Sequence, residues 1–207
     1  AAGAQVAALP MLGSLALAAQ AIAAGGSAAQ REAWLPGLLS GETIAAHVPA
    51  DDLVAEGDRL TGSCAFVAHG SAAQLLLVNG AGGSWLVRAD APGVTVTAQT
   101  TMDQSRPYAR VTLAGAEGEP LADPQAGSKA ATEAGMVVLA AEGLGLAQAA
   151  LNRTVAYARD RVQFGRAIGS FQAYKHRLAD MMVEIEQARS AVYWAACAVE
   201  EGSDEAA

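Results

Sequence analysis

The chain has 207 residues and a net charge of −8, with 52% hydrophobic and 16% charged residues. This length and balance indicate a globular protein with one large or two small domains. An acidic chain lacks the basic face that nucleic-acid binding requires, so no nucleic-acid partner is expected.

The first thirty residues carry no charge, which raises the question of a membrane span or signal peptide. The stretch is mostly Ala and Gly, is broken by Pro10 and Gly13, and has no preceding basic segment. We therefore expect a buried helix of a soluble protein and no membrane span. The chain begins without Met, which suggests a fragment.

Two helices are predicted near the N-terminus. Residues 12–24 have the small and apolar composition of a packed helix, which Gly25-Gly26 should end. Ser27 with Gln30 three residues later is a capping-box pattern, so a second helix should begin there. Pro36 should limit that helix, and residues 43–48 should form a strand.

Short β-strands follow, separated by Gly-rich turns and without a helical pattern between them. Turn signals occur at Asn79-Gly80, Gly82-Gly83 and Pro92-Gly93. Close spacing of this kind predicts a small antiparallel sheet or barrel. The predicted strands are residues 59–69, 74–78, 84–88, 94–98 and 109–113, and a connecting loop should follow at 122–128.

The last third is predicted to be two long helices, at residues 129–158 and 170–201. Gly143 and Gly145 inside the first would mark close approach of another helix backbone. A polar and aromatic corner, Arg161-Val162-Gln163-Phe164-Gly165, separates the two helices. Basic residues crowd this stretch, which suits an anionic small ligand: Arg153, Arg159, Arg161, Arg166, Lys175 and Arg177.

Isolated residues have simple interpretations. Cys64 and Cys197 lie far apart, and two free thiols in a reducing cytosol are the simpler interpretation, so a cytoplasmic location is expected. His47, His69 and His176 lack zinc-site spacing, and no metal ligands are expected. Asp51 and Asp52 are expected to be solvated. Glu184 and Glu186 are expected to be surface or interface residues beside an apolar stripe.

Four stretches together resemble the acyl-CoA dehydrogenase family of flavoproteins. Residues 26–42 are similar to the family's GS-x-x-Q-K-x-x-x-LP-x-L-x-x-GE stretch, and residues 60–69 to its L-N-G-x-K-x-[WF]-I-[TS]-N strand. The helix with Gly143 and Gly145 is similar to the first C-terminal helix. The most specific match is the corner at 161–165, followed by Phe171-Gln172. The resemblance covers nearly all of the chain but only part of a family member.

This resemblance implies an α+β fold: a helical N-terminal part, a middle antiparallel β-barrel and a partial C-terminal up-down helix bundle. The corresponding domain boundaries are 1–42, 43–126 and 127–207. It implies an oxidoreductase that uses FAD for α,β-dehydrogenation of an acyl-CoA thioester. In the family the corner reaches the FAD of a neighbouring subunit, which assigns cofactor binding to Arg161, Gln163, Phe164 and Gln172. The bland alternative for Arg161 is a helix C-cap.

The middle domain departs from the family where the flavin ring would lie. His47-Val48-Pro49-Ala50-Asp51-Asp52 stands for the T-E-P-x-x-G-S-D turn, and Ala68 and His69 stand where a hydroxyl residue and Asn are usual. Phe66 keeps the aromatic position. The family's catalytic Glu falls beyond Ala207, so no catalytic residue is assigned.

Two explanations remain open: omitted segments, or a subunit that has lost its own flavin cradle while completing a partner's. The second implies a heterotetramer with an unlike acyl-CoA dehydrogenase subunit, acting on fatty or steroid side-chain CoA thioesters, with electron-transfer flavoprotein as an acceptor. The alternatives are a homotetrameric acyl-CoA dehydrogenase seen as a fragment, and a flavin-free structural subunit.

Overall fold

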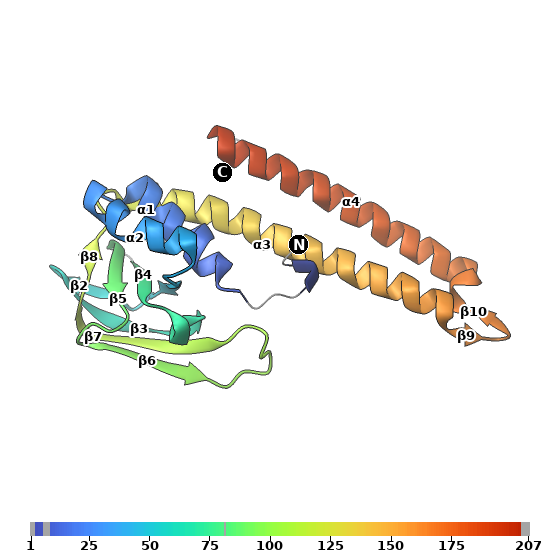
Figure 1. The fold of residues 1–207 in the computed structure, drawn as a ribbon, viewed down its shortest axis with the longest axis horizontal. Coiled ribbons are helices and arrows are strands. Elements are labelled where there is room, and N and C mark those ends of the chain that lie inside the picture. The colour runs from blue at the N-terminus through green and yellow to red at the C-terminus, as the bar shows by residue number, and fades with distance from the viewer. Residues whose placement is uncertain (1–2, 6–8, 81, 204–207) are drawn as a thin grey trace. The chain divides into compact units, whose positions relative to one another are not determined.

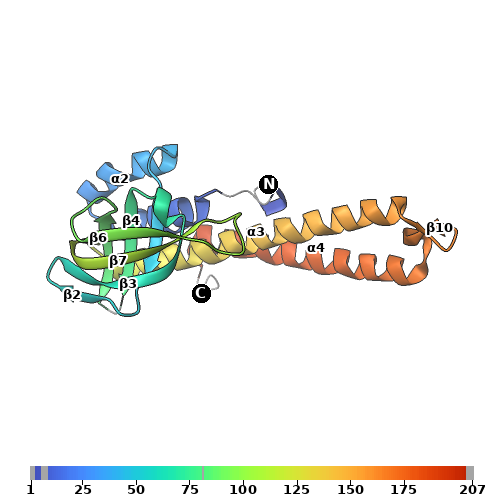
Figure 2. The ribbon, with the colours of Figure 1, turned by 90° about the horizontal axis from the view of Figure 1, so that it is seen from below.

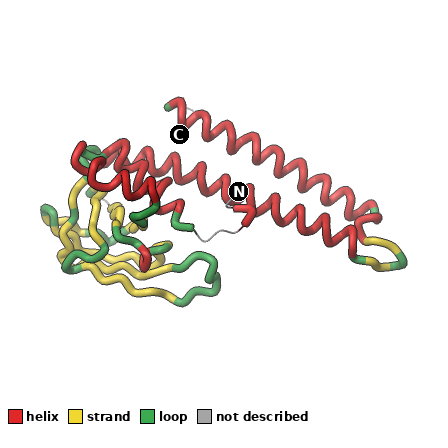
Figure 3. The backbone as a smooth tube through the Cα atoms, viewed as in Figure 1, coloured by secondary structure: helices red, strands yellow, loops and turns green. Residues whose placement is uncertain are grey.

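The structure is a computed structural model that describes residues 3–5, 9–80 and 82–203. Two compact units are present: residues 9–135, and residues 136–203 with the short turn at 3–5. The first unit holds two short helical segments and two sheets, and the second is a pair of long antiparallel helices (Figures 1 and 3).

The first predicted helix is present and is built in two parts. Leu12–Ala19 is a π-helix (η2), and it continues as α1, Gln20–Gly25. The helix ends at Gly25 as predicted, although Gly26 is extended rather than left-handed. Gly25 is needed for space, because a Cβ there would lie 2.8 Å from the backbone nitrogen of Gly127.

Helix α2, Ala28–Ser40, begins with the predicted capping box. The Gln30 backbone N–H donates to Ser27 Oγ at 3.1 Å, and the Ser27 N–H donates to Gln30 Oε1 at 2.8 Å. The prediction that Pro36 limits this helix is wrong, because the helix runs through it and ends at the left-handed Gly41. Pro36 is exposed and removes one backbone bond, whereas Leu38 beyond it is buried and holds the next turn in the core.

The strands form two four-stranded sheets rather than one barrel layer. The predicted strands are all present, and within these two sheets the short strands β2 and β8 were not predicted. The first sheet has the order β1 (Ala45–Pro49), β4 (Leu75–Gly80), β5 (Gly83–Arg88) and β8 (Glu119–Pro120). The second has the order β2 (Val54–Glu56), β3 (Arg59–Ala68), β7 (Tyr108–Glu117) and β6 (Val94–Gln99).

One strand pair differs from the antiparallel prediction. Strand β1 pairs with β4 in parallel, with Ala45 opposite Leu75, because β2 and β3 intervene in the chain and carry it back to the same end. Asn79-Gly80 is also not a turn, since Gly80 pairs with Gly83 as the last rung of the β4–β5 hairpin.

Strand β4 explains how the core is layered. Leu75 and Leu77 face one buried cluster with Ile22 and Leu38, from the helices. Leu76 and Val78 face another with residues of the second sheet. Because strand side chains alternate between faces, the first sheet is a middle layer covered on both sides, which is why β4 is continuously apolar.

The two long helices are α3, Pro124–Asp160, and α4, Gln172–Glu201. The predicted loop at 122–128 is wrong, because Asp123 Oδ1 accepts the Ala126 N–H and Pro124 occupies the first helical position. Gly145 faces the turn at 3–5 rather than another helix, since its Cβ would lie 2.8 Å from the Ala4 nitrogen. A Cβ on Gly143 would meet no described atom within 4 Å, so that prediction is wrong.

Among the described residues, α3 is the one helix whose length and composition would allow it to cross a membrane, with a mean hydropathy of 1.6 in its most apolar window. Core helices of soluble proteins meet the same criterion. The absence of a membrane span stays a prediction.

Candidate functional site

The corner between the long helices is a tight β-hairpin, which the sequence did not predict. Strands β9 (Val162–Gln163) and β10 (Arg166–Ala167) pair antiparallel at the tip of the helical pair (Figure 2). The Ile168 N–H donates to the Arg161 carbonyl at 2.8 Å and closes the hairpin. Phe164 and Gly165 form the two-residue turn, with φ of +53° and +78°. Positive φ at both positions is the type I′ geometry, which normally selects Asn-Gly.

Phe164 is therefore an unfavourable residue for its own backbone. A bulky residue at positive φ is uncommon, and such residues gather at functional sites. Its side chain is also 92% exposed, so burial of the ring does not account for its presence. Both observations favour a contact between this ring and a molecule outside the chain.

The structure brings three of the four predicted binding residues together. Arg161, Gln163 and Phe164 are all exposed on the hairpin, and Gln172 is exposed at the first position of α4. Gln163 Nε2 donates only to the Val162 carbonyl next to it, at 2.9 Å. The Arg161 guanidinium forms no ion pair with a described residue. These polar groups are available to an external ligand.

Two further residues contribute to this region, Arg166 from the predicted basic stretch and Phe171 from the motif, although neither was assigned to cofactor binding. The Phe171 ring meets Phe164 edge to face, with centroids 6.3 Å apart and planes at 89°. The Arg166 guanidinium lies 4.0 Å from the centroid of Phe171. The sequence signal was available in the spacing of Arg166 and Phe171 around the turn, but their contact depends on the hairpin.

In the first unit, the strand end expected beside a flavin ring has an aromatic residue and no hydroxyl. Phe66 and Ala68 project from the same face of β3, opposite the buried Val67. Phe66 is 66% exposed and meets Tyr108 edge to face at 6.4 Å. His69 has a φ of +56°, and its N–H donates to the Pro107 carbonyl at 2.7 Å, as expected for a turn.

The 47–52 segment is absorbed into the structure of the first unit. Val48 is fully buried on β1, and burial lowers the pKa of His47. Asp52 accepts the Ser63 N–H at 2.9 Å and the Ser63 hydroxyl at 3.2 Å, so it is not merely solvated as predicted. The backbone hydrogen bond from Ser63 is the main cause of a lowered pKa for Asp52. The described residues contain no cluster of three potential metal ligands.

Comparisons with known proteins agree with this architecture. The family described as "Acyl-CoA dehydrogenase, C-terminal domain" matches residues 126–207. The acyl-CoA dehydrogenase IpdE2 of Mycolicibacterium smegmatis is 42% identical over 136 residues, which are 62% of this chain and 38% of IpdE2. A solved steroid ACAD, Tcur3481-Tcur3483, superposes with a TM-score of 0.87 at 34% identity, over 99% of this chain and 60% of that one. Residues 126–207 thus belong to the C-terminal domain of the acyl-CoA dehydrogenase family, and the chain as a whole has the acyl-CoA dehydrogenase fold.

A second similar solved structure is the ChsE4-ChsE5 complex from Mycobacterium tuberculosis. It superposes with a TM-score of 0.81 at 34% identity, over 99% of this chain and 60% of that one. The chain thus spans less than two thirds of the length of each of these relatives. The α+β acyl-CoA dehydrogenase fold is confirmed, with the parallel β1–β4 pair as its difference from the predicted barrel.

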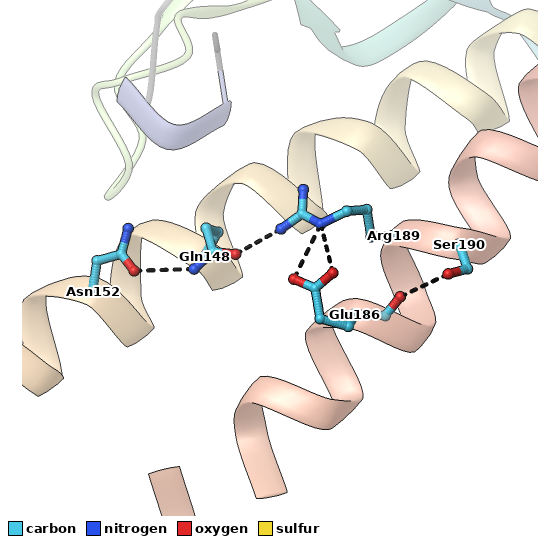
Figure 4. Close-up of polar contacts among 5 residues, drawn as sticks. All are labelled: Gln148, Asn152, Glu186, Arg189 and Ser190. Carbon is cyan, nitrogen blue, oxygen red and sulfur yellow. Dashed lines mark hydrogen bonds and ion pairs between the residues drawn. The ribbon is translucent and has the colours of Figure 1, made fainter. Parts of the chain in front are cut away.

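Within the acyl-CoA dehydrogenase helical region, a polar network joins the two long helices (Figure 4). Arg189 Nη2 donates to Gln148 Oε1 at 2.6 Å, and Arg189 Nε pairs with Glu186 at 3.2 Å. Gln148 Nε2 donates in turn to Asn152 Oδ1 at 3.0 Å. Glu186 is thereby committed to an arginine, which agrees with its interpretation as a polar flanking residue rather than a base.

Proposed function

We propose that this chain is a component of an FAD-dependent acyl-CoA dehydrogenase, in which its hairpin corner completes the FAD site of a partner subunit. The observation that carries the proposal is the pairing of a preformed, exposed corner with an altered cradle. An exposed Phe164 at positive φ and an Arg161 without an ion pair to the described residues are costly for a connection between helices. They suit a nucleotide that arrives from outside.

The donor set of the corner fits FAD. Arg161 can make charge-assisted, bidentate hydrogen bonds to the pyrophosphate. Gln163 and Gln172 offer amides that can donate or accept, and the Phe164 ring offers an apolar face to the adenosine half. All four side chains are exposed, so binding requires no opening of the fold.

The segments of this chain that would hold its own flavin ring, 47–52 and 66–69, do not fit FAD in the same way. Ala68 has no hydroxyl to donate toward a flavin ring, and Val48 points into the core. Asp52, one of the polar side chains of the shortened turn, is already bonded to Ser63. The isoalloxazine ring would therefore find few polar partners on this subunit.

FAD held by Arg161, Gln163, Phe164 and Gln172 would supply the hydride acceptor for the β-hydrogen of the acyl-CoA, and a base would be needed for the α-proton. No residue of this chain is assigned as that base. Its own contribution is to hold the nucleotide half in place, so that the partner's site is complete. The steroid ACAD relative favours a steroid side-chain CoA thioester as substrate. A cytoplasmic location and electron-transfer flavoprotein as acceptor belong to the same proposal.

The partner is proposed to be an unlike acyl-CoA dehydrogenase subunit. This chain would be co-expressed with such a subunit, and the flavin absorbance and native mass of the purified complex compared with those of each chain alone. We expect FAD in the complex and none in this chain alone. Stoichiometric FAD in this chain alone, with acyl-CoA oxidation, would overturn the proposal in favour of a homomeric enzyme.

A further inference from the structure

We infer that Phe171 and Arg166 are positioning residues that hold the Phe164 ring in its outward orientation before FAD arrives. The inference rests on the proposed function and assigns Arg161 and Arg166 different tasks. Arg161 binds the nucleotide, whereas Arg166 and Phe171 shape the turn that presents Phe164.

Phe164 needs a support because its surroundings offer little else. Its side chain is 92% exposed, and its backbone has a φ of +53°. The ring contact recorded for it is the edge-to-face meeting with Phe171 at 6.3 Å and 89°. An exposed ring without such a contact would sample several rotamers, and ligand binding would have to overcome that entropy.

Phe171 is well placed to act as the support because it is anchored to a long helix. Its carbonyl accepts the N–H groups of Tyr174 and Lys175 at 3.1 Å each, in the first turn of α4. Its own N–H donates to the Ile168 carbonyl at 3.2 Å, and the side chain is half-buried. Because both backbone groups of Phe171 are hydrogen-bonded, its ring has a fixed position relative to the start of α4 and can support the turn.

Arg166 completes the stack from the other strand of the hairpin. Its guanidinium lies 4.0 Å from the Phe171 centroid, and Arg166 pairs with Gln163 across the hairpin. A cation over the ring face holds Phe171 in place, and the T-shaped contact between Phe171 and Phe164 is kept at the same time. Because the guanidinium is engaged in this way, Arg161 is left as the corner arginine for the pyrophosphate.

The test compares FAD with FMN, which lacks the adenosine half, as probes of the complex with the unlike subunit. Phe171→Leu keeps apolar bulk but removes the aromatic contact, and Arg166→Met keeps length but removes the cation. We expect each to raise the Kd for FAD about three- to tenfold. The Kd for FMN should stay unchanged, because the turn lies at the nucleotide half. A structural collapse would weaken both probes and would overturn the inference.

Conservative variants and a matched control sharpen the result. Phe171→Tyr and Arg166→Lys keep the ring and the cation, so FAD binding should return to within about twofold of the original. Arg31→Met removes an exposed arginine from the other unit and should leave both Kd values unchanged. Failure of the conservative variants to rescue would contradict positioning.

Arg161→Ala separates this inference from the function on which it rests. If Arg161→Ala weakens FAD binding but Phe171→Leu and Arg166→Met do not, the positioning role is wrong and the nucleotide clamp stands. If none of the three changes FAD binding, the proposed function fails with it.

Discussion

Two regions were expected to meet a flavin: the corner at 161–165 together with Gln172, and the segments 47–52 and 66–69. They differ in what their residues do for the fold. The side chains of Arg161, Gln163, Phe164 and Gln172 are exposed and add little to the core. In the other region, Val48 is fully buried and Asp52 is bonded to Ser63. The corner keeps side chains that the fold does not need, whereas the side chains of the other region take part in the packing and hydrogen bonding of the fold.

This contrast indicates where ligand chemistry remains in the chain. A subunit without any ligand would be more stable with Asn at the type I′ turn than with Phe164. Asp52 in contrast gives the first unit two hydrogen bonds at no cost to another role. Two results would contradict this contrast: a corner variant that leaves FAD binding unchanged, or a variant of segments 47–52 and 66–69 that lets this chain bind flavin by itself.

The largest effect is expected from Arg161→Ala in the complex with the unlike subunit. Loss of a charge-assisted contact to the pyrophosphate should raise the Kd for FAD about 10- to 100-fold, corresponding to about 1.4–2.8 kcal/mol. Titration of the apo complex with FAD, followed by flavin fluorescence, measures it. Because Arg161 is exposed, the thermal unfolding midpoint of this chain should hardly move. An unchanged Kd would show that Arg161 does not bind FAD, and the contrast between the two regions would not hold.

Phe164→Asn should lower FAD affinity while it hardly changes stability. Asn tolerates positive φ better than Phe, while the edge contact to Phe171 is lost, so the free energy of unfolding should stay within about 1 kcal/mol. FAD affinity should fall about tenfold, because the variant has no ring to stack on the adenosine half. Urea denaturation and FAD titration on the same preparation separate the two. A stable variant with full FAD affinity would mean that the ring has no ligand.

Sequence patterns predicted much of the fold because its signals were local. The capping box of Ser27 and Gln30, the continuous apolar run of β4 and the stripe of α4 each appear within a few residues. The α2 end was missed at Pro36, because the burial of Leu38 that carries the helix onward is a tertiary effect. The parallel β1–β4 pair depends on chain crossing, which no local pattern contains.

The candidate site shows the same limit. Arg161, Gln163, Phe164 and Gln172 came from the family motif, and local structure places the first three on one hairpin. The contacts of Phe171 with its neighbours required positive φ at the turn. A Phe-Gly pair is not a usual type I′ signal, so the hairpin was not predicted.

Two histidines make the stability of the first unit depend on pH. Burial lowers the pKa of His47, and burial together with the charge of Arg106 lowers that of His69. The unfolded chain therefore binds protons more readily than the folded one below the ordinary value of about 6.5. The free energy of unfolding should fall as the pH drops from about 7 to 5.

Urea denaturation at several pH values measures this dependence. His69→Asn fits the left-handed backbone and cannot titrate, so it should flatten the curve. His176→Asn, at an exposed position on α4, is the control and should leave the curve unchanged. If the free energy of unfolding is constant over this range, the two histidines are not buried in their neutral form.

The smallest effect is expected from Ala68→Thr, which returns a hydroxyl to the strand beside the flavin position. Ala98→Thr, at an exposed position on β6, is the matched control for a new β-branched residue. We expect neither purified chain to show flavin absorbance, because Val48 stays in the core and Asp52 stays bonded to Ser63. Flavin bound by Ala68→Thr alone would show that one hydroxyl separates the two regions, and that the cradle is otherwise complete.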